Sequence, residues 1–264
     1  MSSQETLHVT SLGQTGDLPP SEKICYADSM IRINRVLGVV ASIALLIVIA
    51  LLLARGCNRA SDEGEIVSPE PETPPVTIVL DPGHGGWDPG GVAGDVLEKD
   101  LNLAIVERIK ALIDRDHPEI RPVLTRTMDV AVDKLDRLKR AEEVGAACYV
   151  SVHVNACDYP EVYGAETWVD DTRPQNDLSW TLARSIQDAL ILATGTRDRG
   201  VRSQEMYLQH TTIPAISMEV GFLTNAEERA KLVDSGYQDQ IAQGIIQGIL
   251  TYLDATGTRP ASGT

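Results

Sequence analysis

From Val76 onward, short apolar runs alternate with segments of helical periodicity, and this alternation limits the possible folds more than any other feature. The runs expected to form strands are VTIVLD, RPVLTR, CYVSVHV, ETWV, EMYLQ and AISMEV. The first helical segment starts near Lys99 and carries a buried stripe of apolar residues at helical spacing, namely Leu101, Ile105, Ile109 and Leu112. The further helical segments are DKLDRLKRAEEVG, DLSWTLARSIQDALILA and QIAQGIIQGILTYL. Strands that alternate with helices predict a single α/β domain with a mainly parallel central sheet flanked by helices.

Residues 36–54 carry no charge and read VLGVVASIALLIVIALLLA. A helix over this run is about 28 Å long, close to the hydrocarbon thickness of a bilayer. A cleaved signal peptide is the alternative, but 35 residues precede the run and no A-x-A-like cleavage site follows it. LLARGC is also similar to a lipoprotein box that ends at Cys57, although Arg55 falls where a small or apolar residue is needed. We therefore expect a retained transmembrane helix.

The apolar run divides the chain into segments with different roles. We expect an N-terminal cytoplasmic tail at 1–35, the transmembrane helix at 36–54, an acidic, proline-rich linker at 55–75, a folded domain at 76–255 and a C-terminal tail at 256–264. Lysine and arginine residues on both sides of the apolar run lean only slightly toward a cytoplasmic N-terminus.

Charge and cysteine content exclude two classes of protein. A net charge of -15 and a pI near 4.7 argue against a nucleic acid as the partner. Four cysteines in 264 residues are too few for a disulfide framework. Cys148 and Cys157 belong to the folded region, one in a strand and one in a loop, and both are expected to be free thiols.

The glycine-rich stretch DPGHGGWDPGG follows the first expected strand and contains one histidine, His84. It matches neither G-x-G-x-x-G nor G-x-x-x-x-G-K-[ST], so it is not a phosphate-binding loop. An ordinary turn remains an alternative, because glycine and proline commonly end strands. Taken alone, His84 is more often structural than a ligand.

Other polar residues fall where they can join His84. Glu98 stands at the start of a helix, and His153 and Glu219 stand near the ends of strands. Because the carboxyl ends of parallel strands meet at one edge of a sheet, we expect these four side chains to converge. Two histidines and a carboxylate suit a catalytic zinc ion, and a further carboxylate can accept a proton from water.

At this point the chain resembles a known family, the zinc-dependent N-acetylmuramoyl-L-alanine amidases of the type called amidase 3. The resemblance runs from about Thr77 to Leu253 and rests on the ordered blocks LDPGHGGWDPG, LEKDLNL, LTRTMD, VSVHVNA, YGAETW, RGVRSQEMYLQHTTIPAISMEVGFLTN and IAQGIIQGILTYL. It implies that a single zinc ion is held by His84, Glu98 and His153. It also implies that Glu219 is the catalytic base.

The implied reaction is hydrolysis of the amide between N-acetylmuramic acid and L-alanine of the peptidoglycan stem peptide. Zinc-bound water would be the nucleophile, and Glu219 would act as general base and then as general acid. The partner would be peptidoglycan, with residues 36–54 in the cytoplasmic membrane and a monomeric catalytic domain on its outer side. The alternatives are a non-catalytic peptidoglycan-binding module and a zinc peptidase that cuts within the stem peptide.

Three further residues are weaker candidates. Asn155 could orient His153 or substrate, or cap its strand; Glu166 could line the groove, or finish a strand at the surface; and His210 could contact substrate. Some members of the family carry an inhibitory helical insertion between the positions of His153 and Glu219. Only 219 − 153 = 66 residues separate them here, and the expected elements use most of that length. We therefore expect a groove that is open without an activator.

Overall fold

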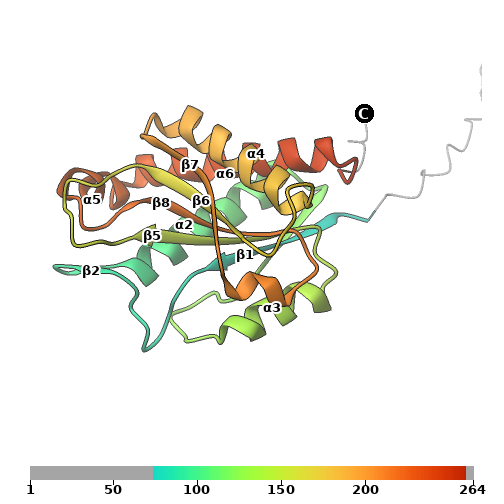
Figure 1. Cartoon of the computed structure of the whole chain (residues 1–264), viewed down its shortest axis with the longest axis horizontal. Helices are drawn as coiled ribbons and strands as arrows, with labels where there is room; N and C mark the ends of the chain where they lie inside the picture. Colours follow the sequence, from blue (N-terminus) through green and yellow to red (C-terminus); the bar gives the residue numbers. More distant parts are fainter. Residues whose placement is uncertain (1–73, 260–264) are drawn as a thin grey trace, which may run out of the picture. The chain divides into compact units, whose positions relative to one another are not determined.

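The computed structural model describes residues 74–259. Its centre is a six-stranded sheet of order β4-β1-β5-β8-β6-β7 (Figure 1). The strands are β1 (Val76–Pro82), β4 (Ile120–Leu124), β5 (Tyr149–Asn155), β6 (Ala165–Asp170), β7 (Asp198–Gln204) and β8 (Ala215–Phe222). Neighbouring strands run parallel except β6 and β8, which are antiparallel. The expected α/β fold with a mainly parallel sheet is confirmed.

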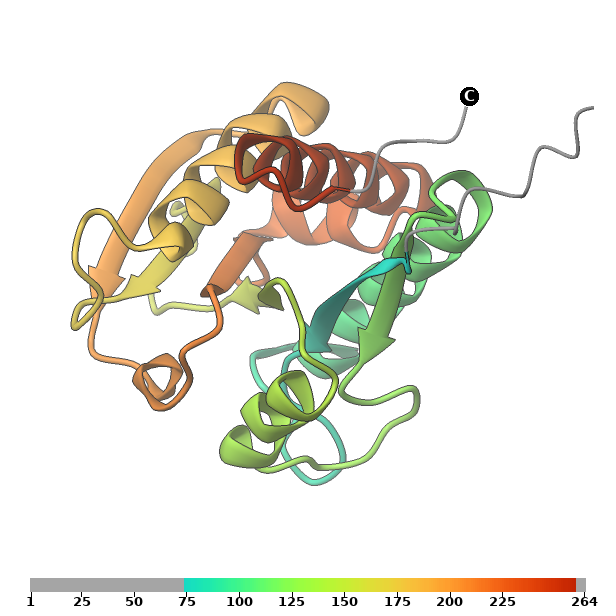
Figure 2. The same ribbon diagram turned by 90° about the vertical axis from the view of Figure 1, so that its right-hand side faces the viewer.

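Helices cover the two faces of the sheet unequally (Figure 2). The larger core lies beneath α2 (Glu98–Asp116), α4 (Leu178–Thr194) and α6 (Ser235–Ala255). On the opposite face, α3 (Lys134–Glu143) and the 3-10 turn η1 (Tyr207–His210) cover a smaller core. The short helix α5 (Ala226–Leu232) follows β8. A small antiparallel hairpin of two-residue strands, β2 (Val92–Ala93) and β3 (Val96–Leu97), precedes α2. We call the side covered by α3 and η1 the α3 face.

Two rows of polar side chains cross the α3 face of the sheet. Successive residues of a strand point to opposite faces, so Val150, Val152 and Val154 enter the larger core while the residues between them point the other way. Strand register then aligns polar residues from different strands. The first row is Asp81, Ser151 and Ser217, and the second is His153, Glu219 and Glu166. The alternation that builds the core therefore also places the polar residues of the site.

Helices α4 and α6 approach closely because α6 has glycine where the two helices touch. A Cβ atom on Gly248 would lie 2.4 Å from Cα of Ile186, and one on Gly244 would lie 2.8 Å from Cα of Leu190. Both glycines are thus required by the helix spacing.

The EMYLQ segment is not a strand, contrary to the prediction. Its residues Tyr207–Gln209 lie in η1, where Leu208 is buried in the smaller core. The strand at this point is β7, whose sequence DRGVRSQ has only one apolar residue. An edge strand has one neighbour and little burial, so it needs no apolar pattern.

The predictions for the two cysteines are confirmed: Cys148 is buried, and Cys157 is partly buried, and both are free thiols. Within residues 74–259, no helix is long and apolar enough to span a bilayer. The predicted N-terminal tail at 1–35 and the predicted transmembrane helix at 36–54 lie outside the described residues. So do residues 55–73 of the predicted linker and residues 260–264 of the predicted C-terminal tail.

Candidate metal centre

Three side chains from separate parts of the sequence meet at the carboxyl edge of the sheet. His84 lies in the loop after β1, Glu98 is the first residue of α2, and His153 lies near the end of β5. Each offers one ligand atom, and these atoms all lie within 4.8 Å of one another. The sequence predicted this convergence from the strand ends, and the structure brings the three residues together.

His84 is held in an unusual backbone conformation. Its φ is 60°, and it is the only non-glycine residue with positive φ in the described part of the chain. Such strain persists only where the surroundings enforce it. Nη2 of Arg137 donates to the His84 carbonyl at 2.8 Å, and Gly85 and Asp88 bond each other through their backbones at 2.9 Å and 3.2 Å. The glycine-rich loop thus forms a fixed turn that presents the imidazole.

Asp88 determines which nitrogen of His84 faces inward. Its Oδ2 lies 2.8 Å from Nδ1 of His84, so Nε2 is left facing Oε1 of Glu98, 3.1 Å away. Burial lowers the pKa of His84, but the hydrogen bonds and charges of Glu98 and Asp88 outweigh it and raise that pKa overall. Asp88 was not among the site residues predicted from the sequence.

Glu98 is buried, with its two carboxylate oxygens in different roles. Oε2 accepts from the backbone N–H of Gly91 at 2.7 Å, whereas Oε1 faces His84 and lies 3.0 Å from Nδ1 of His153. Burial raises the pKa of this carboxyl, but contacts with His153 and then His84 outweigh it and lower the pKa strongly. A carboxylate at a helix N-terminus is further favoured by the helix dipole. Oε1 is thus an ionised oxygen directed at both rings.

The ring of His153 packs directly on the backbone of Gly83. A Cβ atom at residue 83 would lie 2.1 Å from Cε1 of His153 and 2.3 Å from its Nε2, so only glycine fits there. The rings of His84 and His153 meet edge to face, with centroids 4.9 Å apart. His153 is therefore fixed by close packing as well as by its strand.

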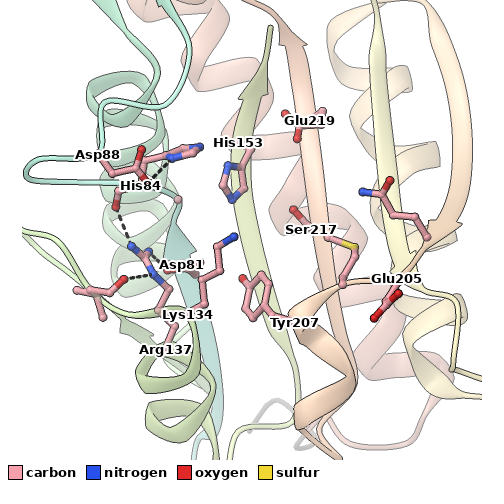
Figure 3. Close-up of a pocket in the computed structure, with 14 residues that line it drawn as sticks. Asp81, His84, Asp88, Lys134, Arg137, His153, Glu205, Tyr207, Ser217 and Glu219 are labelled. Carbon is pink, nitrogen blue, oxygen red and sulfur yellow. Dashed lines mark hydrogen bonds and ion pairs between the residues drawn. The ribbon is translucent and has the colours of Figure 1, made fainter. Parts of the chain in front are cut away.

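Glu219 lies beside His153 as its register partner on β8. Its Oε2 is buried and has no hydrogen-bond partner within residues 74–259. Burial, followed by the charges of Glu98 and Glu166, raises the pKa of Glu219 well above its ordinary value. Figure 3 shows His84, His153 and Glu219 along one side of a cavity. An unpaired carboxyl next to two histidines can exchange protons with a molecule in that cavity.

The cavity measures about 380 Å³. Lys134, at the start of α3, and Tyr207, in η1, face it from the side opposite Glu219 (Figure 3). Glu205 and Gln204 line it where β7 ends. A ligand in this cavity would therefore contact the α3 face of the sheet together with His84 and His153 of the cluster.

The three weaker candidates take different places. Asn155 bonds Glu166 rather than His153, with Nδ2 to Oε1 at 3.0 Å. Glu166 is buried near the start of β6, not exposed at a strand end, and it accepts from Nε of Arg199 at 2.7 Å. Because β6 is antiparallel to β8, its start lies at the same edge as the ends of the parallel strands. His210 is exposed at the end of η1 and does not line the cavity.

A buried network of polar side chains, which was not predicted from the sequence, lies beneath the cluster. Asp81 is buried and accepts from Arg137 Nη1 at 2.5 Å, from the hydroxyls of Tyr149 and Ser151 at 2.6 Å each, and from Thr125. Burial raises the pKa of Asp81, but Arg137 and these hydroxyls outweigh it and lower the pKa overall. A signal was present, since aspartate and serine interrupt the apolar strands VTIVLD and CYVSVHV.

The donor set fits zinc. Catalytic zinc sites commonly have three protein ligands, and two imidazoles with one carboxylate are a frequent combination. Here Asp88 hydrogen-bonds to Nδ1 of His84, and the backbone N–H of Gly91 donates to Oε2 of Glu98. Both of these atoms face away from the other cluster residues. Outer contacts of this kind orient metal ligands. His84, Glu98 and His153 are thus the residues that could hold the ion.

The fold and this cluster define a class of protein, namely α/β domains with a candidate site for one metal ion at the carboxyl edge of the sheet. Residues 78–251 match the family model for N-acetylmuramoyl-L-alanine amidase. The chain belongs to the N-acetylmuramoyl-L-alanine amidase family.

Individual relatives agree with this assignment. The chain is 36% identical over 177 residues to the N-acetylmuramoyl-L-alanine amidase LytC of Bacillus subtilis, covering 67% of this chain but only 35% of LytC. It is 34% identical over 200 residues to the germination-specific N-acetylmuramoyl-L-alanine amidase of the same species, covering 69% of this chain and 82% of that one. The chain thus spans about a third of LytC and most of the germination-specific protein.

Solved structures share the fold. The N-acetylmuramoyl-L-alanine amidase from Clostridium difficile 630 matches with a TM-score of 0.67 and 36% identity, over 70% of this chain and 100% of that one. The catalytic domain of CwlV from Bacillus (Paenibacillus) polymyxa var. colistinus matches with a TM-score of 0.64 and 35% identity, over 68% and 98% of the two chains. The matched part of this chain therefore corresponds to nearly the whole of each solved chain.

Proposed function

We propose that the protein is a zinc-dependent amidase that cleaves the bond between N-acetylmuramic acid and the L-alanine of the peptidoglycan stem peptide. Membership of the amidase family supports the reaction. The observation that carries the proposal is the position of Glu219, an unpaired carboxyl beside the cluster of His84, Glu98 and His153. A binding module would need no such proton acceptor there.

The proposed roles follow from the contacts. His84, Glu98 and His153 hold the ion, which when bound polarises a carbonyl and lowers the pKa of a coordinated water. Glu219 accepts a proton from the attacking water and returns it to the departing amine of L-alanine. Burial raises the pKa of this carboxyl, so its ionised form is a stronger base toward the water proton than an ordinary glutamate is. Glu166 acts on Glu219 only through its charge.

Digestion of purified peptidoglycan by the full-length protein, followed by mass spectrometry, tests the proposal. We expect free stem peptides that begin with L-alanine, together with glycan strands that keep the lactyl group. Release should stop when a chelator removes zinc and resume when zinc is restored. Glu219→Gln should release no peptide above background.

The two alternatives give different products. Peptides that lack L-alanine would indicate a peptidase that cuts within the stem. Binding to peptidoglycan without release, in the presence of zinc, would indicate a non-catalytic module. Because the interval between His153 and Glu219 holds β6, α4, β7 and η1, we also expect activity without an added activator protein.

We further propose that residues 36–54 anchor the protein in the cytoplasmic membrane, with the catalytic domain, a monomer, on the outer side. The uncharged 19-residue run supports the anchor, and the location of peptidoglycan outside this membrane supports the orientation. Protease added to intact cells stripped of their wall should degrade the domain. Full protection of the domain in such cells would contradict both the orientation and the access to peptidoglycan.

A further inference from the structure

We infer that Arg199 and Arg202 form a binding site for a carboxylate of the stem peptide, beside the cavity. This inference rests on the proposed function and deepens it, because it names the chemical group by which the protein recognises the leaving peptide. Both arginines belong to β7, and neither holds the metal ion nor transfers a proton.

A line of residues leads from the cavity to Arg202 across the α3 face of the sheet. Ser217 of β8 lines the cavity (Figure 3), Trp168 of β6 is its register partner, and Arg202 of β7 is the register partner of Trp168. Gln204, two residues further along β7 and therefore on the same face, lines the cavity as well. The side chain of Arg202 is 44% exposed at this place. A molecule that extends out of the cavity over β6 and β7 therefore meets this arginine.

Both guanidinium groups are held through Nε, which leaves their terminal nitrogens available. Nε of Arg199 donates to Oε2 of Glu166 at 2.7 Å, and Nε of Arg202 donates to the carbonyl of Arg199 at 3.3 Å. Within residues 74–259, neither arginine makes a hydrogen bond through Nη1 or Nη2. Such a pair of nitrogens can bind both oxygens of one carboxylate, which makes arginine a common partner of this group.

Aromatic rings hold the two guanidinium groups in place. The guanidinium carbon of Arg199 lies 4.9 Å from the centroid of the Phe222 ring, and that of Arg202 lies 5.7 Å from the centroid of Trp168. A guanidinium over an aromatic ring is held by favourable electrostatic contact. A side chain that is already oriented loses less freedom when a ligand binds. Both groups are thus prepared for an anion before it arrives.

The charges around the arginines leave room for one more anion. Glu166 forms ion pairs with both, since its Oε2 lies 2.7 Å from Nε of Arg199 and 3.5 Å from Nε of Arg202. Two guanidinium groups thus share one carboxylate, and one positive charge is in excess. The chain as a whole has a net charge of -15, so a generally basic surface does not explain this excess. A ligand carboxylate would balance it.

The distance from Glu219 indicates which part of the substrate carries this carboxylate. Glu219 lies on β8, and β6 separates β8 from β7. Two strand spacings amount to about 10 Å. A residue of an extended peptide spans about 3.4 Å, so the arginines face the second or third residue after the scissile bond. The glycan strand has no free carboxylate while its lactyl group is in amide linkage, so the group belongs to the peptide.

The test measures binding of free peptides, the leaving products of the proposed reaction, to the full-length protein by NMR titration. Three synthetic tripeptides differ in their carboxylates. L-Alanyl-γ-D-glutamyl-L-lysinamide carries one on the second residue, L-alanyl-D-isoglutaminyl-L-lysine carries one on the third, and L-alanyl-D-isoglutaminyl-L-lysinamide carries none. The variants are Arg202→Gln and, as the control, Arg184→Gln. Arg184→Gln removes the same charge from an exposed position on α4, on the opposite side of the sheet.

Wild type and Arg184→Gln should bind one of the carboxylate peptides roughly 10- to 100-fold more tightly than the neutral peptide, the effect of hydrogen bonds to a charged group. The peptide that gains this affinity identifies the residue that is recognised. Arg202→Gln should bind all three peptides with similar affinity. Its circular dichroism should be native, because the side chain is 44% exposed.

Equal binding of the three peptides by wild type would overturn the inference. A preference that survives in Arg202→Gln, or that Arg184→Gln loses as well, would also overturn it. The titration needs no turnover, so the two proposals can fail separately. If the preference depends on Arg202 but no peptide is released from peptidoglycan, the proposed function is wrong and this inference stands. If peptide is released but wild type shows no preference, only this inference is wrong.

Discussion

His153 and Glu219 are register partners on adjacent parallel strands, and both side chains point to the α3 face. Neighbouring strands are about 5 Å apart, so the two groups are close without sharing an element. His153 belongs to the cluster that could hold a metal, whereas Glu219 makes no hydrogen bond through its buried Oε2. Metal binding and proton transfer should consequently be separable by single substitutions.

Glu219→Gln should keep zinc affinity and lose turnover. The amide is nearly the same size as the carboxyl but cannot accept the water proton, and loss of a general base typically costs about 10²- to 10⁴-fold in rate. Zinc content and peptidoglycan cleavage are measured on the same preparation. His84→Ala is the comparison, and it should lose both. Near-normal turnover in Glu219→Gln would show that another group is the base.

Glu219 should also make the stability of the zinc-free protein depend on pH. Because burial raises its pKa well above 4.5, the folded state retains a proton that the unfolded state releases above that pH. The stabilising effect of the protonated form is complete below about pH 4.5 and is lost as the pH rises through the folded-state pKa. Melting temperatures of zinc-free wild type and Glu219→Gln are followed as the pH is raised from 4.5, and they should diverge in favour of the variant. A constant difference would contradict the raised pKa.

Gly83→Ala should displace His153 and abolish tight zinc binding. The added methyl group would lie 2.1 Å from Cε1 of the ring, and the ring cannot withdraw without leaving Glu98 and Ser151. Chelator competition measures the loss, which should be at least 100-fold (about 3 kcal/mol) because one ligand is removed. Gly94→Ala is the control: it costs some backbone strain at φ 62° but meets no atom within 4 Å. Equal zinc affinity in the two variants would rule out this role for Gly83.

Gly248→Ala should destabilise the domain by about 1–3 kcal/mol, as insertion of a methyl group into a tight core does. The Cβ atom would lie 2.4 Å from Cα of Ile186, so α4 and α6 would have to separate. Urea unfolding measures the change, with Gln247→Ala on the exposed side of α6 as the control. Unchanged stability in Gly248→Ala would mean that the two helices have room to move apart.

The sequence was sufficient to predict the central strands of the sheet and to predict that His84, Glu98 and His153 lie close together. β1, β5 and β8 are buried strands, and their apolar residues are numerous enough to identify them although polar residues stand among them. His84 and His153 stand at the ends of two of these strands, so the geometry of a parallel sheet brings them together. Glu98 could be added to the predicted cluster because it is the first residue of the helix that comes after the His84 loop.

The parts that were missed depend on long-range pairing. The link from Asp81 to Ser151 requires the register of β1 against β5, which no local pattern defines. β7 is polar because it lies at the sheet edge, and Leu208 is apolar because α3 covers it rather than because it lies in a strand. His210 is near the site in sequence, but η1 turns it outward.

The strand that carries Glu219 is the last to be synthesised, yet it lies in the interior of the sheet. β8 separates β5 from β6, so a chain that ends before Ala215 lacks the strand that joins β4, β1 and β5 to β6 and β7. A truncated chain would hold all three candidate ligands but would expose the edges of β5 and β6 that pair with β8, and such edges are prone to aggregation. The strand that joins the two parts of the sheet is thus also the strand that brings Glu219 beside His153.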